Sequence, residues 1–149
     1  ECLSIFEVLG DKVTYVGPNG SGQSVKLFNQ VVFAMNNLAL AEGLLFASKA
    51  GVDLDVALEA VTAGAAGSWV VSNLGPRVLS KDFKPGFMVR LMEKDLRLIM
   101  EAAQEMGLSL PGTSLTHQLF KSLLSNDEGN KGTQALVKVL KRMAGHELE

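Results

Sequence analysis

The sequence is poor in cysteine, in aromatic residues and in net charge, and each shortage excludes a class of protein. A single cysteine, Cys2, cannot form an intrachain disulfide. The formal net charge is -2 and the aromatic content is 6%. Nucleic-acid binders usually carry a basic surface or several stacking rings. We therefore expect no nucleic-acid partner.

Long uninterrupted apolar runs are also missing. The richest stretch, residues 30–51, is interrupted by two asparagines and by Glu42 and Lys49, whereas a membrane span needs about 18 apolar residues in a row. No charged start precedes an apolar segment and a small-residue cleavage site, as a signal peptide requires. The sequence also starts without Met. We expect part of a longer, cytoplasmic protein without membrane contact, in which residues 146–149 form a tail or a cloning remnant.

A helical body is predicted from residue 21 onward. The 149 residues, 47% of them hydrophobic, suit one domain with its own core. Apolar residues recur at helical spacing, with Gly, Pro, Ser and Asp at the expected ends. The predicted helices cover residues 21–50, 53–62, 68–79 with a break at Gly75-Pro76, 89–106, 111–124 and 133–143. The predicted fold of residues 21–145 is therefore all-α, with a long central helix.

The first twenty residues have a different pattern. Residues 3–9 are typical of the end of a helix that stops at Gly10. Residues 12–16 read KVTYV, a short β-branched alternation that predicts a strand. A glycine-rich loop follows and leads into the long helix. We thus predict a short helix and a strand ahead of the all-α body.

The glycine-rich loop, residues 17–24, reads GPNGSGQS and leaves three interpretations open. A nucleotide phosphate loop requires G-x-x-x-x-G-K followed by Ser or Thr, but Gln23 stands where the lysine belongs. The dinucleotide fingerprint G-x-G-x-x-G does not match either. A plain turn into a helix is one interpretation. An anion site at the helix N-terminus, where glycines let a ligand approach free N–H groups, is another. A degenerate nucleotide loop is a distant third.

Lys26 lies one turn inside the long helix, with Asn29 and Gln30 three and four positions later on the same face. Most lysines are solvated surface groups, and that interpretation stays open. However, the neighbours of Lys26 are apolar, on a helix that we expect to be buried on most sides. Desolvation and the positive end of a helix both favour a lysine that exchanges a proton. The pattern therefore predicts a cation and two amides pointing into one place.

The remaining polar and aromatic candidates have plainer explanations. Lys94 and Asp95 belong to a charged stretch typical of a solvated helix face, and Phe87 is typical of a core residue. The two histidines, His117 and His146, have no metal-ligand spacing with other ligand residues, so we expect no metal site. We assign Trp69 to packing.

An ordered set of motifs resembles the β-hydroxyacid dehydrogenase family, which includes 3-hydroxyisobutyrate dehydrogenase and tartronate semialdehyde reductase. The first motif is G-x-G-x-x-x-K, which runs from Gly20 to Lys26 and is followed by Asn29. The later motifs, in order, are AEG at 41–43, KAGV at 49–52, DFKPGF at 82–87, KDL at 94–96, Gly107 and Pro111. The resemblance covers roughly residues 8 to 145.

The resemblance implies a two-domain enzyme that uses NAD or NADP to interconvert a small hydroxy acid and its semialdehyde. Residues 21–145 then correspond to the all-α C-terminal domain, similar to that of 6-phosphogluconate dehydrogenase relatives. Residues 1–20 correspond to the last helix and strand of an N-terminal Rossmann domain, most of which is not in this chain. The isolated chain is then expected to be inactive, and to form a homodimer or homotetramer through its all-α domain.

The resemblance also implies roles for individual residues. Lys26 is the implied general acid/base. The implied substrate-binding residues are Gly22, Asn29, Gln30 and Phe87. The implied cofactor-binding residues are Phe87, Lys94 and Asp95. A non-catalytic helical dimerisation or assembly module is the alternative function, and the presence of Lys26 favours the enzyme over it.

Overall fold

A computed structural model describes residues 3–148, which form seven α-helices and one short 3-10 helix. The predicted all-α fold is confirmed. Glu1, Cys2 and Glu149 lie outside the described residues, and with them the single cysteine and the last residue of the predicted tail. The elements are α1 (Leu3–Leu9), α2 (Ser21–Lys49), α3 (Leu54–Thr62), α4 (Trp69–Leu79), α5 (Val89–Glu105), α6 (Pro111–Ser125), η1 (Thr133–Ala135) and α7 (Leu136–Ala144).

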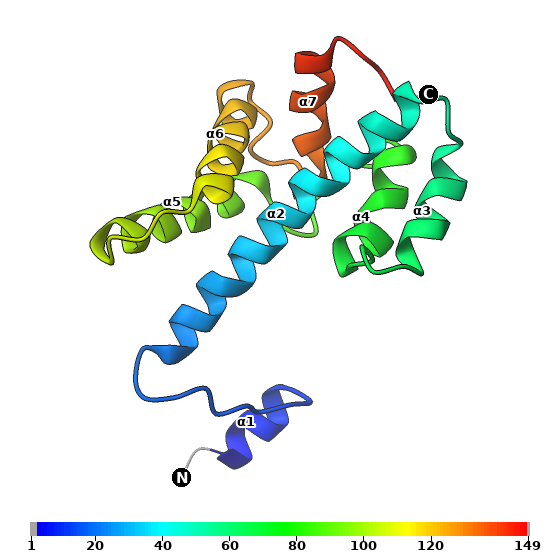
Figure 1. Cartoon of the computed structure of the whole chain (residues 1–149). Helices are drawn as coiled ribbons and strands as arrows, with labels where there is room; N and C mark the ends of the chain where they lie inside the picture. The colour runs from blue at the N-terminus through cyan, green and yellow to red at the C-terminus, as the bar shows by residue number, and fades with distance from the viewer. Residues whose placement is uncertain (1–2, 149) are drawn as a thin grey trace.

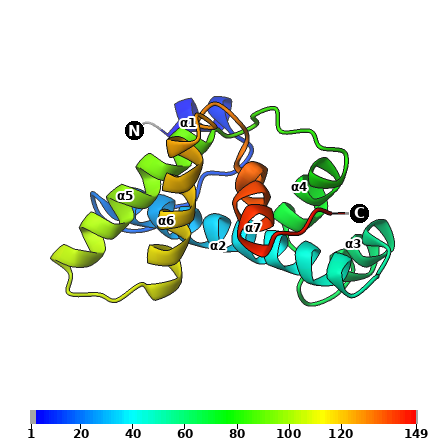
Figure 2. The same cartoon turned by 90° about the horizontal axis from the view of Figure 1, so that it is seen from above.

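Helix α2 is the axis of the molecule. Its 29 residues span about 44 Å at the rise of an α-helix. Helices α3 to α7 all pack against it. Figure 1 shows α3 and α4 beside its C-terminal half and α5 and α6 on the other side, and Figure 2 shows the same arrangement from above. The first turns of α2 project from this bundle toward α1, which lies apart from the other helices (Figure 1).

The composition of α2 follows from this central place. The helix is long and apolar enough to cross a membrane by length and composition alone, with a mean hydropathy of 1.5 over an 18-residue window. Of that window, 33% is buried inside the domain. Leu38, Ala41 and Leu44 belong to the core formed with the other helices. Packing between helices therefore accounts for apolar residues in the second half of α2.

Local capping signals set several of the helix ends. The Asp53 carboxylate accepts a hydrogen bond from the Val56 N–H at 3.0 Å and begins α3. The Ser68 hydroxyl accepts one from the Val71 N–H at 3.1 Å and begins α4. Gly51, with φ of +75°, follows the last turn of α2 in the left-handed conformation that glycine adopts without strain. These ends match the predicted ones because caps act over a few residues only.

The break predicted at Gly75-Pro76 is wrong, because α4 runs through it without interruption. Pro76 is exposed and lies three residues before the helix end, so its missing N–H removes one backbone hydrogen bond only. Gly75 is buried, and a Cβ there would lie 2.8 Å from Leu58 Cδ2. The glycine is present because α4 approaches α3 closely, rather than to end the helix.

The strand predicted at residues 12–16 is also wrong. Within residues 3–148 the structure forms no strand, and its β pairing is a single antiparallel bridge between Met88 and Gly132. A strand needs a neighbour to pair its backbone N–H and C=O groups. Residues 12–16 have no such neighbour, and Tyr15 is 86% exposed. Of the predicted helix and strand, only helix α1 forms, so the structure does not support a Rossmann remnant in residues 3–20.

Candidate functional site

The glycine-rich loop has a structural explanation in the turn that leads into α2. Gly20, at the N-cap of α2, has φ of +95°. Gly17 has φ of +130°, and a Cβ there would lie 2.6 Å from Ser21 Oγ. The N–H of Ser21 already donates to the Pro18 carbonyl at 3.0 Å. Gly22, predicted to bind substrate, lies exposed in the first turn. The plain turn is thus sufficient to explain this loop.

Lys26 is exposed, contrary to the expectation that a buried helix would desolvate it. The first turns of α2 extend beyond the bundle (Figure 1), and Val25 and Phe28 are exposed there. Leu27, between them, is partly buried and packs against the core. Among the described residues, Lys26 makes no hydrogen bond or ion pair. Its ammonium group is therefore open to a ligand at this end of the domain.

One turn after Lys26, four of the predicted site residues form a continuous polar chain. Asn29 Nδ2 donates to Gln30 Oε1 at 3.0 Å. Gln30 Nε2 in turn donates to Asp95 Oδ2 at 2.7 Å, which joins α2 to α5. The Lys94 ammonium lies 2.6 Å from the other carboxylate oxygen of Asp95. Asp95 is 4% exposed, so it is not part of a solvated helix face.

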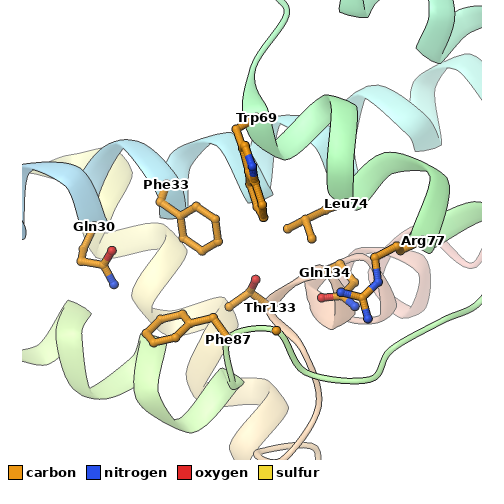
Figure 3. Close-up of a pocket in the computed structure, with 9 residues that line it drawn as sticks. Gln30, Phe33, Trp69, Leu74, Arg77, Phe87, Thr133 and Gln134 are labelled. Atoms are coloured by element: carbon orange, nitrogen blue, oxygen red, sulfur yellow. The ribbon is translucent and has the colours of Figure 1, made fainter. Parts of the chain in front are cut away.

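Phe87 lies beside this polar chain at a cavity of about 370 Å³. It stands just ahead of α5 and is half-buried, so it is not simply a core residue. Gln30 lines the same cavity from α2 (Figure 3). The structure therefore brings together five of the predicted residues: Asn29, Gln30, Phe87, Lys94 and Asp95. Lys26 lies next to this group because it is one turn earlier on the same face of α2.

Other residues that line the cavity did not stand out in the sequence. Phe33, Trp69 and Leu74 form its apolar wall, while Arg77, Thr133 and Gln134 add polar groups. The Phe33 ring lies 6.3 Å from both Trp69 and Phe87, measured between ring centroids. Trp69 is 64% exposed, so its assignment to packing was incomplete. The sequence offered one signal for this role: Trp69 directly precedes the buried apolar residues of α4, which begin at Val70.

Arg77 and Gln134 hold the loop that carries Phe87. Arg77 Nε donates to Asp82 Oδ2 at 3.0 Å, and its Nη2 donates to the Lys84 carbonyl at 2.6 Å. Gln134 is buried and donates to the Asp82 carbonyl at 2.9 Å. The backbone N–H of Lys84 and the Arg77 guanidinium hold the pKa of Asp82 below its usual range. The loop is thus tied to both α4 and η1.

The histidines lie elsewhere and are engaged in tertiary contacts. His117 Nε2 on α6 is 3.0 Å from Glu93 Oε1 on α5. His146 Nε2 is 2.9 Å from Ser48 Oγ at the end of α2, which docks the predicted tail onto the domain. Within the described part of the chain, no group of three or more His, Cys, Asp or Glu side chains could hold a metal ion.

Comparison with known proteins gives consistent matches. A family model described as NAD-binding of NADP-dependent 3-hydroxyisobutyrate dehydrogenase matches residues 20–140. The probable 3-hydroxyisobutyrate dehydrogenase-like 1 of Arabidopsis thaliana is 46% identical over 93% of this chain and 41% of its own length. The 2-hydroxy-3-oxopropionate reductase of Escherichia coli is 40% identical over 97% of this chain and 49% of its own length.

The fold is shared with a solved relative. The structure of a Mycobacterium tuberculosis 3-hydroxyisobutyrate dehydrogenase with L-serine matches 94% of this chain and 50% of its own length, with a TM-score of 0.86 and 27% identity. The chain described here spans about half the length of the curated relatives it matches.

Proposed function

Because the chain belongs to the family of C-terminal NAD-binding domains of 3-hydroxyisobutyrate dehydrogenases, we propose that it acts within an NAD(P)-dependent dehydrogenase of small β-hydroxy acids. In this proposal a Rossmann domain elsewhere in the polypeptide binds most of the cofactor. The present domain supplies the proton-transfer group and one wall of the substrate site. On its own, this domain would not catalyse the reaction.

The polar chain behind Lys26 carries this proposal. A dehydrogenase needs one proton-exchanging group at the substrate hydroxyl and rigid groups around it. Lys26 Nζ is accessible, and Asn29 and Gln30 follow it on the same helical face. Gln30 is held by buried Asp95 at 2.7 Å, so its orientation is set by a second helix. An exposed lysine beside a fixed amide and an aromatic cavity suits a polar substrate of a few carbons.

Lys26 would act at the hydroxyl oxygen of the substrate. In the oxidation direction, its neutral amine takes the hydroxyl proton as the carbonyl forms. In the reduction direction, the ammonium returns that proton to the developing alkoxide. The positive charge also stabilises the oxyanion in the transition state. Asn29 and Gln30 would orient the substrate for this step.

The residues on the Phe87 side fit a nicotinamide dinucleotide. The half-buried Phe87 ring offers an apolar face, and the Lys94 ammonium, which is 46% exposed, offers a cation for a phosphate. The bound cofactor supplies the hydride acceptor or donor. Phe87 would keep water from the nicotinamide side, and Asp95 would hold Lys94 in place.

Substitution of Lys26 tests this function in the full-length dehydrogenase that contains the chain. We expect Lys26→Ala to reduce kcat by about 10²–10⁴, the usual loss on removing a general acid/base. Lys26→Arg should not restore turnover, because a guanidinium does not give up its proton near neutral pH. Cofactor affinity should change little in both variants. Near-normal kcat for Lys26→Ala would refute the proposal.

Lys94→Ala is the matched comparison on the cofactor side. It removes the lysine that pairs with Asp95 in the polar chain, so we expect weaker cofactor binding with a smaller effect on the chemical step. Cofactor titration and steady-state kinetics of the two variants separate these effects. Equal losses of cofactor affinity and of kcat in the two variants would contradict the separate roles of Lys26 and Lys94.

A further inference from the structure

One charged residue of the cavity has no task in the proposed chemistry. Arg77, on α4, lines the cavity, whereas Gln30 lines it from α2. Figure 3 shows Gln30 and Arg77 at opposite ends of the labelled group, with the aromatic side chains between them. Since Gln30 lies on the face of Lys26, Arg77 marks the end of the cavity that is remote from the proposed proton transfer.

Arg77 is held on one edge only. Its Nε donates to Asp82, and its Nη2 lies 3.0 Å from the same carboxylate and donates to the Lys84 carbonyl. Its Nη1 donates no hydrogen bond within residues 3–148. A guanidinium has five N–H donors in a planar fork, and two of them are on Nη1. The contacts with Asp82 and the Lys84 carbonyl therefore fix the plane of the group and leave the two N–H groups of Nη1 available.

The cavity is open toward this free edge. Gly86 lines the cavity next to Arg77, and a Cβ at Gly86 would lie 3.9 Å from Nη1. Any larger side chain at this position would begin in van der Waals contact with Nη1. The glycine thus leaves room for a ligand atom to reach the guanidinium.

The surface between the two ends is mainly apolar. Phe33, Trp69 and Leu74 border it on one side, and Phe87 on the other (Figure 3). An occupant that reaches from Gln30 to Arg77 must therefore carry polar groups at both ends and methylene groups between them. The two N–H groups of Nη1 can donate charge-assisted hydrogen bonds, for which a carboxylate oxygen is a strong acceptor.

We propose that Arg77 is a specificity-determining residue that binds a second, remote carboxylate, so that the substrate class is hydroxy dicarboxylic acids. This inference rests on the proposed function for the statement that the ligand is a substrate. The binding contact itself requires only the described cavity. Arg77 is a binding group here and takes no part in proton transfer.

A tryptophan in the cavity provides an intrinsic fluorescence probe for this contact. Trp69 is its only tryptophan and lines the cavity. Titration of the 149-residue chain with glutarate, followed by tryptophan fluorescence, measures occupancy directly. Valerate has the same five-carbon skeleton and a single carboxylate, so it serves as the matched ligand. We expect glutarate to bind about tenfold or more tightly than valerate, as a charged hydrogen bond provides, and sodium sulfate at equal ionic strength to leave the fluorescence unchanged.

Three variants test whether Arg77 causes the preference for glutarate over valerate. Arg77→Met keeps the length of the side chain and removes the charge, so the preference for glutarate should disappear while valerate binding remains. Asp82→Asn breaks the ion pair with Arg77 but keeps the guanidinium, so the preference should remain. A merely structural role of Arg77 would make these two variants alike. Gly86→Val leaves that ion pair intact and fills the approach to Nη1, so it should weaken glutarate binding selectively.

The inference is overturned if glutarate and valerate bind equally, or if Arg77→Met retains the preference. If circular dichroism shows that Arg77→Met does not fold, an unchanged preference in Gly86→Val overturns it instead. Lys26→Ala should keep the preference, since Lys26 is not part of the contact. Loss of turnover in Lys26→Ala and loss of the glutarate preference in Arg77→Met are therefore separate results, and either proposal can fail alone.

Discussion

Gln30 on α2 and Asp95 on α5 are 65 positions apart in the chain and joined by a 2.7 Å hydrogen bond between buried side chains. The bond places the amide and the carboxylate in fixed register across two helices. Lys94 and Asn29 extend it to the surface on both sides. This pair makes the candidate site a property of the packed domain, and not of α2 alone.

Gln30→Leu should destabilise the domain. The substitution removes a donor from a buried carboxylate, which costs about 1–3 kcal/mol when the carboxylate finds no replacement. Urea unfolding followed by circular dichroism measures the change in the free energy of unfolding. Asn29→Ala is the control on the same helix, where the exposed side chain should contribute less than about 0.5 kcal/mol. Equal effects of the two variants would contradict the assigned importance of the Gln30–Asp95 bond.

A second buried carboxylate makes stability depend on pH. Glu128 is 7% exposed and lies against Lys131 at 2.9 Å, against Lys138, and 3.7 Å from Arg142. Burial raises the pKa of Glu128, but hydrogen bonds and charge from Lys138 and Lys131 outweigh it and hold the pKa below the ordinary value of 4.5. The folded state therefore binds this proton less readily than the unfolded chain. Its stabilisation is complete above pH 4.5 and is lost as pH falls below that value.

Glu128→Gln should lower the free energy of unfolding at pH 7 by about 3 kcal/mol. This is the lower end of the range for a broken buried ion pair, because the three cations are partly exposed. The difference from the wild type should shrink as pH falls below 4.5, because the unfolded carboxylate takes up a proton there more readily than the native one. Urea unfolding at neutral and acidic pH measures both effects.

Glu101→Gln provides the matched control for Glu128→Gln. The same substitution breaks the ion pair between Arg97 and Glu101, whose side chains are 50% and 55% exposed. An exposed pair contributes at most about 1 kcal/mol. A loss at Glu101 as large as that at Glu128 would show that burial of Glu128 is not what matters.

Two glycines in the link between α3 and α4 should respond differently to alanine. A Cβ at Gly67 would lie 2.4 Å from the Thr62 carbonyl oxygen, whereas at Gly64 the nearest atom would be 3.6 Å away. Gly67→Ala must therefore shift the backbone ahead of Trp69, and we expect a loss of about 1–3 kcal/mol. Gly64→Ala should be close to neutral. Thermal unfolding of both variants, with Trp69 fluorescence as a local probe, tests this difference.

We also propose that the chain self-associates through the exposed apolar start of α2, where Phe28 is 66% exposed between Val25 and Val32. Burial of such side chains favours association. Sedimentation at high micromolar concentration should show a dimer or larger species, and Phe28→Asp should shift it toward monomer. Phe46→Asp, at a phenylalanine near the other end of α2 that is 79% exposed, should not. A purely monomeric wild type would refute this proposal.

The helices could be predicted because their signals are local. Asp53 and Ser68 cap the helices that follow them, and Gly51 ends α2, as expected from a few neighbouring residues. The β-branched segment 12–16 misled the prediction because strand propensity becomes a strand only when another strand is available to pair with it. The break predicted at Gly75 was wrong because glycine occurs at close contacts between helices as well as at helix ends. The residue that Gly75 contacts, Leu58, lies in another helix, α3.

For the candidate site, the sequence by itself determined the residue types and their helical spacing: Lys26, Asn29 and Gln30 share one face of α2 because a helix repeats every 3.6 residues. Only the tertiary structure decided that Lys26 is exposed while Asp95 is buried, since burial depends on which helices pack on each turn. It also decided that Arg77 faces the same cavity as Gln30. Contacts between residues so distant in sequence arise from the packing of whole helices, and no short pattern around either residue encodes them.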